Sequence, residues 1–122
     1  MSSNVTYKYI RQNPDIHTYI KNADAAVKAQ GYTEHSFAHV EKVADTVKMI
    51  LEGLGYDERK VELGMIAAYL HDIGNVINRI DHAQSGAVMA FRLLDNLNMP
   101  AEEIYAISYP LSAIMTRALL SL

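Results

Sequence analysis

Residues 63–70 read Leu63-Gly64-Met65-Ile66-Ala67-Ala68-Tyr69-Leu70 and are apolar almost all the way round a helix. A helix of this kind must be covered on every side, so we predict that it is central and buried. Asp57 is suitably placed to cap its first turn, and His71-Asp72 follows its last apolar residue. The central helix is therefore predicted to run from about residue 57 to about residue 71.

Two helices are predicted before this central one. Asn13 can cap the first, with Pro14 at its first helical position and Gly31 as a plausible end. The second should cover residues 35–53, where glycines mark its end. Its predicted inward face consists of Val40, Val43, Val47, Ile50 and Leu54.

Two more helices are predicted after it. One begins near residue 81 or 82, and its apolar face consists of Ala87, Phe91, Leu94 and Leu97. The other follows the turn at 98–100 and carries Glu102 and Glu103 in its first turn, where acidic side chains suit the helix dipole. No run alternates with period two over a useful length, so no strand is predicted. We expect an all-α fold, a compact bundle of about five to six helices forming one domain over residues 1–122.

Composition narrows the function classes. The chain has 122 residues, half of them hydrophobic, which is enough for one domain with a real core. It has no cysteine, which removes disulfides, thiolate catalysis and cysteine-based zinc sites and fits a cytoplasmic location. No run is long and apolar enough for a membrane span, and the start lacks the apolar region of a signal peptide. A net charge of −3 without a basic stripe argues against a nucleic-acid partner.

The histidines are the candidate functional residues. His35 and His39 are four residues apart and share one helix face, but no glutamate lies between them as in zinc proteases. His71-Asp72 ends the most buried helix, where an ionisable pair is costly unless it is partnered or binds a metal. Taken alone, each pattern also has a structural explanation, such as a histidine beside the last helix carbonyls. His17 has no motif around it and is predicted to be a surface histidine.

Three segments, taken together, favour the functional explanation of the histidines over the structural one. They are residues 34–44, Glu-His-Ser-Phe-Ala-His-Val-Glu-Lys-Val-Ala; residues 67–75, Ala-Ala-Tyr-Leu-His-Asp-Ile-Gly-Asn; and residues 81–87, Asp-His-Ala-Gln-Ser-Gly-Ala. In this order they resemble the motifs of the HD superfamily of metal-dependent phosphohydrolases. The resemblance covers about residues 14–107 and implies an all-α, HD-domain-like fold.

The resemblance also implies roles for individual residues. His39, His71 and Asp72 would be ligands of one divalent metal ion, and His82 matches a position that helps bind a second ion in two-metal members. His71 and Asp72 would form the catalytic centre. Histidine and carboxylate ligands without sulfur suit several ions, and Mn, Fe, Mg, Zn and Ni all stay open.

The implied reaction is attack of metal-activated water on a phosphate ester, with a nucleotide or a related metabolite as the small-molecule substrate. His35 could touch the substrate phosphate or simply lie at the start of its helix. Arg79, in the segment between the last two motifs, could clamp the phosphate or be a solvated arginine. No residue identifies a base or a sugar.

The family pattern is incomplete in this chain. It requires a distal aspartate ligand, whereas no Asp or His follows Asp95. Residues 108–122 form an atypical tail, and we expect that the domain is partial and truncated at its C-terminus. One hypothesis is a one-base shift near codon 110, because the shifted frame can encode Ala-Ile-Gly-Asn-His-Asp-Glu, which is similar to a further histidine helix of the family. The nucleotide sequence would test this.

Two consequences follow from the incomplete pattern. Activity could be impaired, and the alternative function is a non-catalytic helical module that binds a metal, a nucleotide or another protein. Missing helices would also leave apolar surface uncovered, so a homo-oligomer is expected.

Overall fold

The computed structural model describes residues 5–29, 37–71, 73 and 90–108. Residues 90–96 are helical, and the labelled helices are α1 (Tyr7–Gln12), α2 (Pro14–Ala29), α3 (Phe37–Gly53), α4 (Glu58–Leu70) and α6 (Ala101–Ser108). No strand occurs in the described ranges, and the fold is all-α, as predicted.

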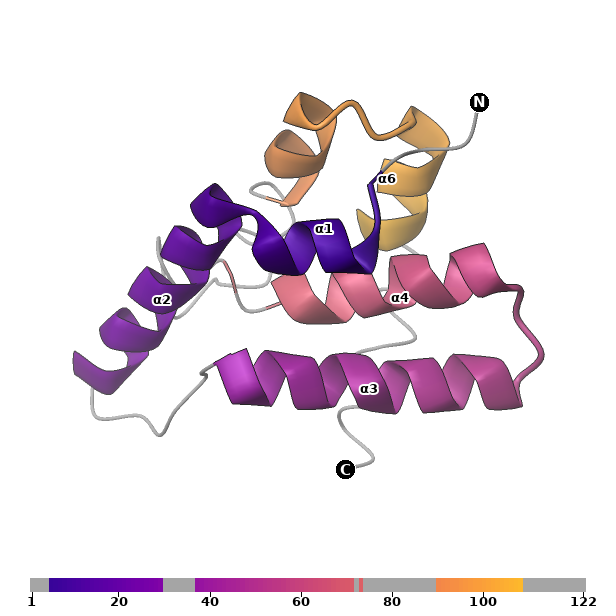
Figure 1. The fold of residues 1–122 in the computed structure, drawn as a ribbon, viewed down its shortest axis with the longest axis horizontal. Helices are drawn as coiled ribbons and strands as arrows, with labels where there is room; N and C mark the ends of the chain where they lie inside the picture. The colour runs from indigo at the N-terminus through magenta and orange to yellow at the C-terminus, as the bar shows by residue number, and fades with distance from the viewer. Residues whose placement is uncertain (1–4, 30–36, 72, 74–89, 109–122) are drawn as a thin grey trace.

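Helix α4 is the centre of this arrangement. It runs antiparallel to α3 along most of its length, and it also packs against α1 and α6 (Figure 1). Because other helices cover it on several sides, its residues are buried nearly all round, as the apolar stretch predicts. The buried residues of α4 are Val61, Leu63, Gly64, Ile66, Ala67, Ala68, Tyr69 and Leu70.

The predicted helix caps are present. The Asp57 carboxylate accepts a hydrogen bond from the Lys60 amide at 2.9 Å, which satisfies one of the unpaired N–H groups at the start of α4. The Asn13 side chain accepts hydrogen bonds from the amides of Asp15 and Ile16 at 2.9 and 3.1 Å. These caps set where α4 and α2 begin.

Helix α1 was not predicted from the sequence. It has six residues and one buried side chain, Ile10, so its sequence shows too little periodicity to mark a helix. Two features hold it in place. The Thr6 hydroxyl accepts a hydrogen bond from the Tyr9 amide at 3.0 Å, and the Tyr7 ring meets Tyr69 of α4 edge to face at 5.7 Å between centroids.

The prediction that two residues of the apolar faces are buried is wrong. Leu54 is 65% exposed, because α3 ends at Gly53 and the chain turns through Gly55, whose φ is 85°. Leu51 is buried instead. Phe91 is 54% exposed, while Ala90 and Leu94 of the same helical segment face the core. Ala87 lies outside the described residues.

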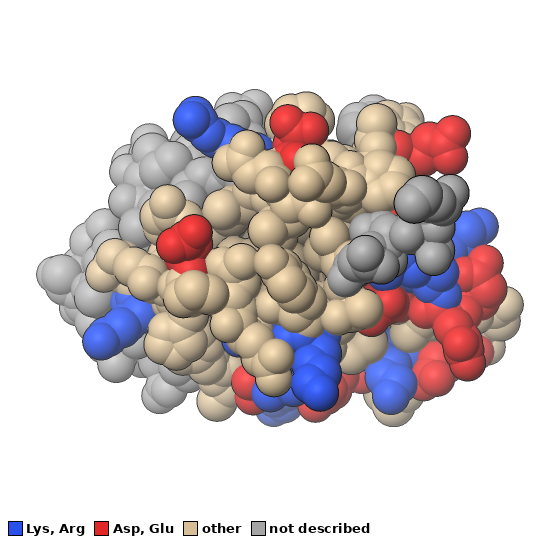
Figure 2. Space-filling model, turned by 45° about the horizontal axis from the view of Figure 1, so that its top comes forward, with Lys and Arg blue, Asp and Glu red and all other residues tan. Residues whose placement is uncertain are grey.

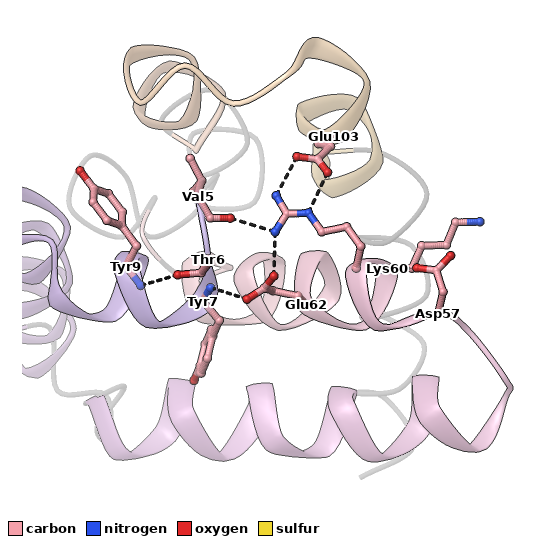
Figure 3. Close-up of polar contacts among 9 residues, drawn as sticks. Val5, Thr6, Tyr7, Tyr9, Asp57, Lys60, Glu62 and Glu103 are labelled. Carbon is pink, nitrogen blue, oxygen red and sulfur yellow. Dashed lines mark hydrogen bonds and ion pairs between the residues drawn. The ribbon is translucent and has the colours of Figure 1, made fainter. Parts of the chain in front are cut away.

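Arg59 joins three parts of the chain, and Figure 3 shows its contacts with the labelled residues Val5, Glu62 and Glu103. Its guanidinium donates two hydrogen bonds of 2.7 Å to Glu103 of α6, one of 2.7 Å to Glu62 and one of 2.9 Å to the Val5 carbonyl. The other Glu62 oxygen accepts the Tyr7 amide at 3.0 Å. A single side chain therefore fixes the N-terminal segment and α6 on the central helix.

Replacement of Arg59 by methionine is expected to lower the free energy of unfolding by about 2 kcal/mol. The change keeps the aliphatic stem but leaves two half-buried carboxylates without their cation, and partial exposure to water reduces the cost below that of a fully buried pair. Urea denaturation measures this loss. Arg92→Met, at an exposed position, is the matched control and should change stability by less than about 0.5 kcal/mol.

The same contact predicts a pH dependence. The hydrogen bonds from Arg59 hold the pKa of Glu103 below its ordinary value. A carboxyl group whose pKa is lowered by folding stabilises the fold above its unfolded pKa, about 4.3, and this contribution is lost as the pH falls through the lowered value. The stability difference between the parent and Arg59→Met should therefore shrink below about pH 4. A constant difference down to pH 2 would contradict the role of Glu103.

The charged surface is mixed. On the face in Figure 2, basic and acidic side chains lie interspersed along the lower and right-hand edges, and the centre carries few charges. Among the described helices, none combines the length and apolar character that a membrane span requires.

Candidate functional site

Two of the predicted site histidines lie next to each other. His39 is in the first turn of α3 and His71 is the C-cap residue of α4. Because the two helices are antiparallel, the start of one lies beside the end of the other. The imidazole centroids are 5.7 Å apart and their planes are inclined by 58°. Residues 32 positions apart in the chain are thus brought to one end of the helix pair.

The ring of His71 is held in a defined tautomer. Its Nδ1 lies 2.6 Å from the Ala68 carbonyl oxygen. A carbonyl oxygen can only accept, so Nδ1 carries the hydrogen and donates it. In the neutral imidazole the lone pair is then on Nε2. Histidine ligands of metals commonly donate their other N–H to a backbone carbonyl in this way, because the bond fixes the ring's orientation and tautomer.

The ligand type and the spacing of His39 and His71 both suit a divalent metal ion. Imidazole nitrogens bind ions such as Zn²⁺ at about 2.0–2.1 Å, so rings whose centres are 5.7 Å apart are close enough to share one ion. Both histidines are half-buried at a helix end. Two ligands do not make a complete site, and the described residues contain no group of three or more metal-ligating side chains.

The remaining predicted site residues lie outside the described residues. These are His35, Asp72, Arg79 and His82, together with the atypical tail from residue 109 onward. Their roles stay predictions. His17 is exposed, as predicted, and its ring stacks on Phe37 at 4.4 Å between centroids.

A cavity of about 480 Å³ lies on another side of the α3–α4 pair. Side chains from α1, the start of α2, the start of α3 and the end of α4 line it. Sequence reasoning missed it because α1 was not predicted. The sequence contained one signal for this cavity. Tyr7 and Arg11 are four residues apart, and in a helix this spacing places both side chains on one face.

The phenol of Tyr7, which lines this cavity, is expected to ionise at a higher pH than an ordinary tyrosine. Burial, the largest cause, raises the pKa of its phenol to about 12. A raised phenol pKa contributes stability that is complete below the unfolded value of about 10 and is lost as the pH rises through the folded value. Carbon-13 NMR of labelled tyrosine should show one ring, absent in Tyr7→Phe, that titrates near pH 12. Titration of that ring at pH 10 would contradict its burial.

The fold and the histidine pair define an all-α domain with a two-histidine site at one end of its central helix pair. The HD domain family model matches residues 36–111, which include α3, α4, both described site histidines and α6. The chain therefore belongs to the HD domain family.

One curated relative is an uncharacterized protein of Methanocaldococcus jannaschii. It is 27% identical over an alignment of 106 positions, and the alignment covers 75% of this chain and 41% of the relative. The chain thus spans about two fifths of that relative's length. No solved structure matches the chain.

Proposed function

We propose that this chain is a metal-dependent phosphohydrolase that acts on a small phosphate ester, with a nucleotide as the leading substrate class. The observation that carries the proposal is the His39–His71 pair, with rings 5.7 Å apart and the tautomer of His71 set by the Ala68 carbonyl. Membership of the HD family supports it.

In this proposal His39 and His71 each coordinate the same divalent ion through one ring nitrogen. The bond to Ala68 keeps Nε2 of His71 as the ligating nitrogen and prevents the ring from turning away. Asp72, next in the chain, is proposed to complete the ligand set, and His82 to contribute to a second ion. A bound divalent ion supplies Lewis acidity, which activates water and polarises the phosphoryl group.

Substrate contacts are proposed for two cationic or polar side chains. Arg79 would hold the phosphate through its guanidinium, which binds phosphate oxygens in a bidentate manner. His35 would contact the same phosphate. The proposed partner is therefore a small-molecule phosphate ester, and a homo-oligomer in the cytoplasm remains the proposed form of the protein.

Metal analysis followed by a phosphatase screen tests the proposal. The purified chain is stripped with a chelator, reloaded separately with Mn²⁺, Fe²⁺, Mg²⁺, Zn²⁺ or Ni²⁺, and assayed for phosphate release from nucleoside monophosphates and a generic aryl phosphate. We expect near-stoichiometric binding of at least one ion and phosphate release that requires it. Failure to bind any of these ions would contradict the proposal.

A second result would favour the alternative. Stoichiometric metal or nucleotide binding with no phosphate release across the screen would identify a non-catalytic binding module.

A further inference from the structure

The cavity bordered by α1 has a lining that is unlike the histidine site. Lys8 and Arg11 bring two positive charges to it, and Glu41 brings one negative charge. The surplus is positive although the whole chain has a net charge of −3. At about 480 Å³ the cavity is within the range of small-molecule sites, about 300–1,000 Å³.

Arg11 is the best anchor for an anion in this cavity. One of its nitrogens, Nη2, donates to Glu41 at 3.0 Å, and its guanidinium lies 5.5 Å from the centre of the Tyr7 ring. These contacts hold the side chain over the cavity. A guanidinium has five N–H donors, so a carboxylate or phosphate can be bound beside Glu41.

Apart from Gln12, the rest of the lining is aromatic. His17 and Phe37 stack with 26° between their planes, and Tyr7 meets Tyr69 edge to face. Aromatic walls favour flat, apolar ring systems through stacked and edge contacts. The cavity thus joins a cationic anchor to a surface that suits a ring.

This cavity and the histidine pair lie on different faces of the same two helices. Glu41 follows His39 by two residues, and His71 follows Tyr69 by two. Two residues correspond to a rotation of about 200° round a helix, so the members of each pair point to nearly opposite sides. Glu41 contacts Arg11 of α1 and Tyr69 contacts Tyr7 of α1, whereas the two histidines contact each other. A ligand here would therefore not occupy the proposed metal site.

We propose that the cavity bordered by α1 is a second binding site, which takes a small planar organic anion whose carboxylate or phosphate lies on Arg11 and whose ring lies against the aromatic walls. This inference does not depend on the proposed phosphohydrolase activity, because no residue of the histidine pair takes part.

Benzoate is the test ligand, and benzamide, which has the same ring without the charge, is its control. Binding is followed by titration with carbon-13 NMR of labelled tyrosine, in which Tyr7→Phe assigns the Tyr7 ring. We expect saturable, millimolar binding of benzoate with a shift of the Tyr7 signal and at least tenfold weaker binding of benzamide. Equal binding of the two, or no saturation, would overturn the proposal.

Variants locate the site. Arg11→Ala and Lys8→Ala should each weaken benzoate binding, Arg11→Ala by about tenfold or more, and Glu41→Gln should strengthen it by a few fold because a repulsive charge is removed. Lys48→Ala, an exposed lysine of α3 outside the cavity, should leave it unchanged. Circular dichroism checks that each variant is folded.

His71→Ala separates this site from the proposed metal site. Benzoate binding should persist in His71→Ala, since that side chain lies outside the cavity. Loss of binding in this variant, together with unchanged binding in Arg11→Ala and Lys8→Ala, would place benzoate at the histidine pair and overturn the inference. Loss of phosphatase activity in His71→Ala would bear only on the proposed function.

Discussion

Replacement of either His39 or His71 by alanine is expected to remove the bound metal and to lower kcat/KM for phosphate release by at least about 100-fold. Loss of a residue that merely supports a metal ligand commonly costs about 10–100-fold, and loss of a ligand itself should cost more. Each variant leaves one imidazole and the proposed ligand Asp72 in place, which we expect to be too few ligands to hold the ion. Elemental analysis and steady-state kinetics measure the two effects.

A matched control separates this loss from damage to the fold. Asp45→Ala removes another potential ligand from α3, at an exposed position, and should keep both metal and activity. Thermal unfolding of the metal-free proteins should give similar midpoints for the parent and the histidine variants, because both side chains are only half-buried. Full metal occupancy in both His39→Ala and His71→Ala would contradict the assignment of the pair.

Replacement of Gly64 by valine is expected to lower the free energy of unfolding by about 3 kcal/mol. A Cβ atom added at Gly64 would collide with Leu51 and press on Val47 at 3.2 Å, both on the facing side of α3. Leu51 is 1% exposed, so it has little room to move aside, and overpacking of a dense core typically costs about 1–3 kcal/mol for a small excess of volume. Valine adds three carbons and a stiff χ1 angle.

Gly53→Ala is the control for this substitution. Gly53 ends α3, and nothing lies within 4 Å of the position that its Cβ would take. The unfolded chain loses freedom while the folded chain loses nothing, so a gain of about 0.4–1 kcal/mol is expected. Chemical denaturation of both variants gives the comparison. Equal stability of Gly64→Val and the parent would mean that α3 and α4 are not so closely packed.

The position of Gly64 also bears on the histidine pair. Where one helix has no side chain at the contact, the two helix axes can approach closely, and interaxial distances depend on the side chains at the contact. A valine that separates α3 from α4 should also weaken metal binding, since His39 and His71 come one from each helix. Metal content of Gly64→Val therefore reports on the spacing of the pair.

Local sequence signals were sufficient for most helices and for their starts. Asn13 and Asp57 cap helices because their side chains reach amides two or three residues onward, a relation that the sequence displays directly. The same holds for the burial of α4, since a helix that is apolar all round has no side to expose. Helix α1 could not be found in this way, because the contacts that dock it on the central helices, Tyr7 with Glu62 and Arg11 with Glu41, join residues 55 and 30 positions apart.

The end of a helix changed which side chains face the core. Leu54 fits the spacing of the α3 apolar face, but that spacing has no meaning beyond Gly53, where the helix stops and the chain turns through Gly55. Phe91 shows a second limit. Its exposure depends on which side of the 90–96 segment packs against the rest of the chain, and periodicity alone does not assign that side.

By itself the sequence determined the helical class, the central helix, the caps and the motif residues of the HD family, because these depend on neighbours a few positions apart. Only the tertiary structure decided that His39 and His71 meet with 5.7 Å between ring centroids, that Arg59 ties Val5 and Glu103 to α4, and that α1 borders a cavity. These features require the antiparallel packing of α3 on α4 and the docking of α1. Such contacts join residues far apart in the chain, and no local pattern encodes their geometry.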